Sequence, residues 1–222
     1  KWVNDNTGSQ FIKQPHSAPS FAGVAPQGAL VATDEYLVVP GGRSVPAVLQ
    51  RNDGVQKYFE INAGGKGTGG SLVIANDERF YVHTRQKGTR AFNLETGLKT
   101  AFMPNEPVLA NGFVYTAELA DEQPVVRAYG SDDKVIWEVH ADGQGDLILA
   151  GNHLYAAGKN SITAIRLPED QQPATVTQTI PVQGRIERIL AGNGKLFAVT
   201  LQGAIMAFGE GNKSAAPSNK NE

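Results

Sequence analysis

Short apolar runs alternate with polar turns along the whole chain, and no helical period persists for more than a turn or two. Proline and glycine interrupt the chain too often for long helices. Apolar runs that end in alanine recur, and each is followed by a small polar turn and a second apolar run. Two short strands joined by such a turn form a β-hairpin. The pattern therefore predicts an all-β chain built from hairpins.

The hairpins repeat with a nearly constant period. The alanines that close the first runs are 43, 35, 40 and 41 residues apart, at Ala32, Ala75, Ala110, Ala150 and Ala191. Each hairpin is followed by a third run and, in most units, a fourth, such as TRAFNL at 89–94 and LKTAF at 98–102. Four strands in about 40 residues are typical of a β-propeller blade. A β-sandwich of short strands is the alternative, but it has no reason to repeat its turns at a fixed interval.

The units add up to twenty strands, or five antiparallel blades of four strands. They are one outer strand at 1–5, four full units at about 28–61, 71–102, 107–139 and 147–182, and three strands at 186–208. A ladder between residues 1–5 and 203–208 would close a five-blade ring and remove the exposed edge. The other possibility is an arc of a larger propeller. We expect a propeller domain over 1–209 and a flexible tail or linker over 210–222, which has no bulky apolar residue.

The segment Ala91-x-Asn93-x-x-Thr96-Gly97 resembles the tryptophan-docking motif A-x-D-x-x-T-G-x-x-x-W of quinoprotein-like, PQQ-type β-propellers. The resemblance covers roughly 1–209. It implies that an aromatic residue on each outer strand occupies a docking position. Trp2 and Trp137 match that position, whereas Tyr58 and Ala101 replace the tryptophan in their units.

Two further resemblances bear on function. The segments QPHSAPSFAGVAPQG and VPGGRSVPAV resemble planctomycete-type bacterial multidomain proteins that join such repeats to a methyltransferase domain. No methyltransferase glycine motif is present, so a fused domain of that kind would lie outside this chain. The chain is also similar to the propeller lipoprotein of the outer-membrane β-barrel assembly machine, a scaffold. These likenesses imply a bacterial, extracytoplasmic or periplasmic protein, although no signal peptide is visible.

Composition excludes several kinds of site. The chain has no cysteine, so disulfides, thiolate zinc sites and cysteine nucleophiles are absent. Quinoprotein dehydrogenases have eight blades and a disulfide stacked on the quinone, so we expect no pyrroloquinoline quinone or other cofactor here. The formal net charge is −2 and the pI about 6.1, which does not favour a nucleic-acid partner. No apolar run is long enough for a membrane span.

The topology predicts one ligand-binding end of the propeller. Loops between blades and loops between the second and third strands of each blade emerge together, and ligands bind to loops held by a rigid scaffold. Guanidinium and imidazole groups in these loops are candidates for ligand binding, and the histidines could also approach a metal. The candidate ligand-binding residues are His16, Arg43, His83, Arg85 and His140. His153 belongs to a turn at the opposite end and is not a candidate.

Other polar segments fit ordinary loop chemistry better than a site. GGKGTGG at 64–70 lacks the spacing and the following helix of a phosphate-binding loop, and we interpret it as an interblade loop. HADGQGD at 140–146 lacks the rhythm of a calcium loop, so we interpret Asp142 and Asp146 as turn residues and predict no metal site. No Ser/His/Asp motif or nucleophile elbow is present.

The sequence therefore predicts a non-enzymatic propeller, a scaffold or binding module that binds a protein or small ligand at the interblade-loop face. The alternative is the propeller part of a quinone- or carbohydrate-processing enzyme, with a ligand or metal in the central funnel.

Overall fold

The structure, a computed structural model, describes residues 1–5, 10–13, 19–22, 24, 26–41, 46–59, 68–84, 88–103, 105–169 and 172–209. By internal contacts the chain divides into two compact units. One comprises Lys1–Thr116 with Ala128–Lys134, and the other comprises Ala117–Arg127 with Val135–Glu222. All regular structure in the described residues is β-strand, and no helix there could span a membrane.

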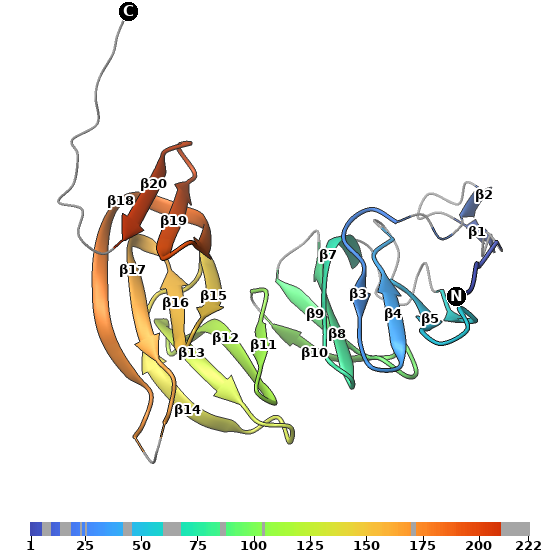
Figure 1. The fold of residues 1–222 in the computed structure, drawn as a ribbon, viewed down its shortest axis with the longest axis horizontal. Helices are drawn as coiled ribbons and strands as arrows, with labels where there is room; N and C mark the ends of the chain where they lie inside the picture. Colours follow the sequence, from blue (N-terminus) through green and yellow to red (C-terminus); the bar gives the residue numbers. More distant parts are fainter. Residues whose placement is uncertain are drawn as a thin grey trace, which may run out of the picture. The chain divides into compact units, whose positions relative to one another are not determined.

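The strands follow the predicted meander, with antiparallel neighbours in chain order (Figure 1). A short hairpin pairs β1 (Gln10–Lys13) with β2 (Pro19–Ala22). The first sheet contains β3 (Val31–Ala32), β4 (Tyr36–Val39), β5 (Ala47–Gln50) and β6 (Gln56–Tyr58). The second sheet contains β7 (Thr68–Ala75), β8 (Arg79–Thr84), β9 (Thr89–Asn93) and β10 (Lys99–Met103). The third contains β11 (Val108–Ala110), β12 (Phe113–Ala120), β13 (Gln123–Tyr129) and β14 (Val135–His140).

The last sheet has six strands in chain order. They are β15 (Asp146–Ala150), β16 (His153–Ala157), β17 (Lys159–Arg166), β18 (Thr175–Gly192), β19 (Lys195–Thr200) and β20 (Ile205–Gly209). The predicted Asn-Gly hairpins are confirmed here and in the third sheet. Asn111-Gly112 and Asn193-Gly194 all have positive φ, as a type I′ turn requires.

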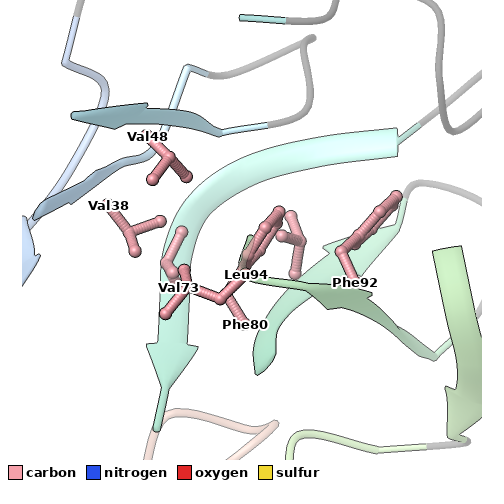
Figure 2. Close-up of a cluster of buried hydrophobic side chains, with 7 residues drawn as sticks. Val38, Val48, Val73, Phe80, Phe92 and Leu94 are labelled. Atoms are coloured by element: carbon pink, nitrogen blue, oxygen red, sulfur yellow. The ribbon is translucent and has the colours of Figure 1, made fainter. Parts of the chain in front are cut away.

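Apolar side chains of consecutive sheets pack face to face. Val38 and Val48 of the first sheet meet Val73, Phe80 and other residues of the second in one buried cluster (Figure 2). The rings of Phe80 and Phe92 stack with their centroids 5.1 Å apart. A second cluster continues from Tyr81 and Ala91 to Val114 on β12. Apolar residues of the second sheet are thus buried against both neighbouring sheets, which is how ringed blades bury their faces.

The alanines of the third strands are the small residues that this packing requires. Ala47, Ala91, Ala128 and Ala164 are all buried. The alanines that end the first strands are only half-buried or exposed. The predicted role of alanine in close sheet packing therefore holds for these four third strands, whereas Ala207, on the edge strand β20, is exposed.

One predicted boundary is wrong. The units at 147–182 and 186–208 share a single 18-residue strand, β18, drawn in Figure 1 as one long curved arrow. Its first part pairs with β17 and its second part with β19. Pro181 lies where β18 pairs with β17, and Gly184 follows with a φ of 105°. A proline is tolerated on a strand with one free edge, so the strand continues through both residues.

Three other local predictions change. Residues 1–5 form no strand, so the strand predicted there is wrong, and the ring-closing ladder onto 203–208 stays a prediction. The connection predicted over 6–27 contains the β1–β2 hairpin. In the GGKGTGG segment, residues 68–70 belong to β7 rather than to a loop. The predicted tail, 210–222, lies outside the described residues.

Candidate functional site

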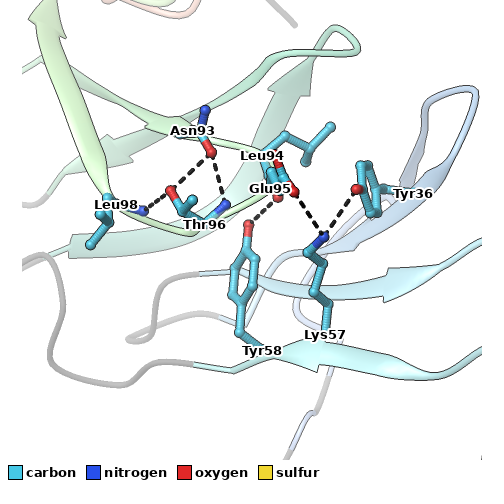
Figure 3. A network of polar contacts seen from close by, with 8 residues as sticks. All are labelled: Tyr36, Lys57, Tyr58, Asn93, Leu94, Glu95, Thr96 and Leu98. Carbon is cyan, nitrogen blue, oxygen red and sulfur yellow. Dashed lines mark hydrogen bonds and ion pairs between the residues drawn. The ribbon is translucent and has the colours of Figure 1, made fainter.

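Two aromatic residues, Trp2 of the N-terminal segment and Tyr58 on β6, dock on glycine turns of the sheet that follows them in the chain. Trp2 lies against Gly54, and its indole Nε1 donates a hydrogen bond to the backbone oxygen of Arg51 at 2.8 Å. Tyr58 lies against Gly97 in the same way, and its hydroxyl donates to the backbone oxygen of Leu94 at 2.7 Å (Figure 3). These contacts confirm the docking positions predicted for Trp2 and Tyr58.

The turn at 93–98 is shaped to receive the Tyr58 ring. The Asn93 side chain accepts hydrogen bonds from the backbone nitrogen and the hydroxyl of Thr96, at 2.8 and 2.9 Å. Gly97 has a φ of 70°, and a Cβ there would come within 2.9 Å of the ring. Only glycine combines this backbone with a bare surface for the aromatic ring.

Lys57, which directly precedes the docked Tyr58, makes polar contacts on both sides. Figure 3 shows Lys57 between Tyr36 and Glu95; its Nζ donates to the Tyr36 hydroxyl at 3.1 Å and lies 4.0 Å from the Glu95 carboxylate. Burial raises the pKa of the Tyr58 hydroxyl, and the nearby Tyr36 raises it further. Tyr58 is therefore a structural hydrogen-bond donor and is not poised to lose a proton.

On β10, the outer strand of the second sheet, the docking position holds Ala101 instead of an aromatic residue. An ion pair is present in this sheet instead. Arg79 on β8 donates to both carboxylate oxygens of Asp133, at 2.5 and 2.8 Å. Asp133 lies in the turn between β13 and β14, where its φ is 59°. The hydrogen bond to Asp133 raises the pKa of Arg79, so the guanidinium stays charged. A bidentate salt bridge thus links the second sheet to a turn whose positive-φ position is held by Asp133 instead of a glycine.

Trp137 has no glycine turn in front of it. It lines a hollow of about 460 Å³ together with Ile136 and the connection between β17 and β18. The residues of that connection in the hollow are Pro168, Glu169, Gln172, Pro173 and Ala174. The docking position predicted for Trp137 is therefore occupied by the right residue, but the space beside it stays open.

The predicted loop face is confirmed in its arrangement. In each unit, residues of the connections between sheets contact residues at or beside the connections between second and third strands. Within the first unit, Gln27 donates to Pro40, and His83 lies 3.8 Å from Glu106. Within the second unit, Ala141 donates to Pro124 and Lys159 donates to the Asp142 carboxylate. We call the end of each unit that these connections form its loop face.

The structure describes two of the five candidate ligand-binding residues. His83 ends β8 on the loop face; its side chain is 55% exposed, and its Nδ1 lies 3.8 Å from a Glu106 oxygen. His140 ends β14 and is also exposed. They belong to different units, and each is described separately. His16, Arg43 and Arg85 lie outside the described residues, so their role stays a prediction.

The two aspartates of the HADGQGD segment bind the backbone. Asp142 accepts hydrogen bonds from the backbone nitrogens of Gln144 and Lys159, at 3.1 and 2.9 Å. Asp146 accepts one from the backbone nitrogen of Ile189 at 2.9 Å. Asp142 thus acts as the predicted turn residue, whereas Asp146 binds the backbone of β18, a contact that was not predicted. Among the described residues, no group of three or more His, Asp or Glu could hold a metal ion.

Sequence reasoning missed a charge network across the third sheet. Arg127 on β13 donates to Glu138 on β14 at 2.7 Å and to Glu118 on β12 at 3.3 Å. Side chains on adjacent strands meet only in the right register, and the register was not known from the sequence. The residues were visible as opposite charges on consecutive runs, which was the available signal.

A second hollow lies at the opposite end of the first unit, lined by turn residues. Asp34 donates its backbone N–H to Asp77 at 2.9 Å, and Arg51 donates to the Thr33 backbone oxygen at 2.8 Å. These bonds fix the turns that follow β3 and β7. These polar groups of the hollow therefore serve as structural contacts of the turns.

Comparison with known proteins shows the fold. No protein-family model and no curated protein matches the chain. BamB from Moraxella catarrhalis aligns with a TM-score of 0.52 at 13% identity, over 91% of this chain and 67% of that one. The WD40 β-propeller domain of Doa1 aligns at 0.52 and 11%, over 87% and 67%. U3-55K aligns at 0.51 and 14%, over 83% and 62%. The chain therefore has the predicted all-β, β-propeller fold.

Proposed function

We propose that this protein is a non-enzymatic β-propeller scaffold that binds a protein or small ligand at its loop face. The observation that carries the proposal is the use of Asp142 and Asp146. Their carboxylates accept hydrogen bonds from backbone nitrogens and so stabilise the strands and turns themselves. The most chemically suggestive segment of the sequence is thus committed to structure.

Exposed side chains on the loop face supply the binding contacts in this proposal. His83 stands beside Glu106, and a partner that donates or accepts hydrogen bonds can reach both groups. His140 plays a corresponding part in the second unit. We place His16, Arg43 and Arg85 in the same binding surface, as their loops imply. Loops on a rigid scaffold are the usual place for such contacts.

The setting of the proposal follows the quinoprotein-like resemblance of the docking motif. We propose an extracytoplasmic, bacterial protein whose partner is another protein or a small ligand. The likeness to planctomycete-type multidomain proteins, with a fused domain outside this chain, stays a prediction. So does the absence of pyrroloquinoline quinone or another cofactor.

Site-specific photo-cross-linking tests the loop face as the binding surface. A photo-reactive residue at His83 or His140 should capture a discrete partner in cells, and the same residue at His153 is the matched control. His153 begins β16 after the turn at 151–152, away from the loop face. Capture from His153 alone would contradict the proposal.

Enzyme assays test the alternative directly. The purified chain should show no saturable oxidation of alcohols or sugars with added quinone and calcium. Turnover that disappears in Arg43→Ala or His83→Ala would overturn the scaffold proposal and favour an enzyme.

A further inference from the structure

The outer edge of β14 differs from the outer edges of the earlier sheets. β14 is the outermost strand of its sheet, as β6 and β10 are of theirs. The strands β6 and β10 carry Lys57 and Lys99, and a charged residue on an edge strand discourages pairing with another chain. The one acid of β14, Glu138, is paired with Arg127 of the same sheet, and the strand begins with Val135 and Ile136, which are 47% and 55% exposed. No strand pairs with this edge among the residues that the structure describes.

The hollow beside Trp137 lies on the same strand. Ile136 and Trp137 are consecutive residues whose side chains leave opposite faces of β14, yet both line the hollow. The hollow therefore extends around the edge of the strand. Its volume of about 460 Å³ can hold a large side chain, and Pro168, Pro173 and Ala174 give it an apolar wall.

One carboxylate sets the charge of this hollow. Glu169 lines it, and within the described chain its side chain takes part in no ion pair. The backbone groups of Glu169 and Gln172 bond to each other, at 2.8 and 3.3 Å, and fix the place of this residue in the connection. Glu138, the acid on β14, is paired with Arg127. A basic group of a ligand would therefore find its partner in Glu169.

We propose that the β14 edge binds an extended peptide of a partner protein. The peptide adds a strand beside β14, places a bulky apolar side chain in the hollow against Trp137, and directs an arginine or lysine to Glu169. Main-chain hydrogen bonds supply affinity in this mode of recognition, and side-chain pockets supply specificity. Residues 210–222 of this chain contain no bulky apolar side chain, so a partner fits the hollow better than the chain's own tail.

This site goes beyond the loop-face function, because β14 binds through its edge and not through the loop connections. Either proposal can fail while the other holds. Loss of cross-linking at His83 leaves the β14 edge unaffected, and loss of peptide binding leaves the loop face unaffected.

Tryptophan fluorescence provides the readout. The chain has two tryptophans, so Trp2→Phe leaves Trp137 as the only one. The probe is a capped peptide that alternates leucine and threonine and has an arginine at each end. We expect a saturable shift of Trp137 emission, and a weaker one with a peptide that has glutamates in place of the arginines. No saturable change up to about 1 mM peptide would overturn the proposal.

Substitutions in the same Trp2→Phe background locate the site. Ile136→Lys gives β14 the edge charge of β6 and β10, and should weaken binding by about tenfold or more. Leu98→Lys is the matched control, because Leu98 is 68% exposed and lies before β10, outside the hollow. Circular dichroism should show both variants folded. Equal binding by Ile136→Lys and Leu98→Lys would overturn the placement.

The role of the Glu169 charge is tested by combining a neutral variant with peptides of either charge. Glu169→Gln should weaken the arginine peptide several-fold and leave the glutamate peptide no weaker than before. Two results would show that the site is occupied by something other than a partner peptide, and either would overturn the proposal. One is self-association that Ile136→Lys abolishes, which means a second copy, and the other is a shift of Trp137 emission on deletion of residues 210–222.

Discussion

Tyr58 and Trp137 occupy the same docking position in the repeat, but their surroundings differ. Tyr58 lies against Gly97, and its hydroxyl donates to a backbone oxygen of the next sheet. Trp137 lies beside an open hollow, because the connection in front of it has prolines and no glycine turn. We therefore expect the Tyr58 ring, which lies on a glycine turn, to stabilise the fold more than the Trp137 ring does.

The largest effect is expected from Tyr58→Ala. The substitution removes a ring packed on the core cluster and the hydrogen bond to Leu94. We expect a loss of about 3 kcal/mol in the free energy of unfolding, as for a large aromatic residue in a packed site. Urea-induced unfolding measures it, and Leu98→Ala, at an exposed position of the same turn, is the control. A loss below 1 kcal/mol would mean that docking contributes little.

Gly97→Ala tests the same contact by changing the turn instead of the tyrosine. Alanine at a φ of 70° is strained, and its Cβ would come within 2.9 Å of the Tyr58 ring. We expect about 2 kcal/mol of destabilisation. Gly112→Ala is the control, because Gly112 also has a positive φ but nothing within 4 Å of its Cβ. The difference between the two losses measures the docking contact, and no difference would remove the turn from our account.

Arg79→Met tests the ion pair found beside Ala101. Methionine keeps an apolar stem but cannot bond to Asp133. We expect a loss of about 1 kcal/mol, because the arginine is partly buried and the pair is bidentate. The loss should shrink when salt is raised to about 1 M, since the Asp133 side is exposed. A salt-independent loss would indicate packing instead of charge.

Tyr58 also predicts a dependence on alkaline pH. Its folded-state pKa is raised above the unfolded value, so the neutral hydroxyl is favoured by folding. This contribution is complete below pH about 10 and is lost as the pH rises through the folded-state pKa. Tyr58→Phe should cost about 1 kcal/mol at neutral pH through the lost hydrogen bond. Its stability should then fall less steeply than that of the unchanged protein between pH 9 and 11; parallel curves would contradict the assignment.

Local sequence patterns predicted most of the strands, because a hairpin depends on neighbouring residues. The Asn-Gly turns at 111–112 and 193–194 and the alanines of the third strands illustrate this. The sequence did not predict that β18 continues as one strand, because Pro181 and Gly184, taken alone, indicate a turn. An edge strand tolerates both, and being an edge strand is a property of the sheet, not of the segment.

The candidate sites were less predictable, because they depend on register and on the path of loops. The loop face followed from topology, but the contact of His83 with Glu106 did not. The triad of Arg127, Glu118 and Glu138 needs three strands in register. The hollow beside Trp137 depends on how the connection after β17 folds back, and a tryptophan in the docking position suggested a filled slot.

The most direct test compares Tyr58→Ala with Trp137→Ala in the same urea-unfolding experiment, with circular dichroism as the common signal. Our account predicts that Trp137→Ala costs less than about 1 kcal/mol and Tyr58→Ala about 3 kcal/mol, although tryptophan is the larger residue. A loss for Trp137→Ala equal to or larger than that for Tyr58→Ala would contradict the claim that the glycine turn decides whether an outer-strand aromatic residue stabilises this fold.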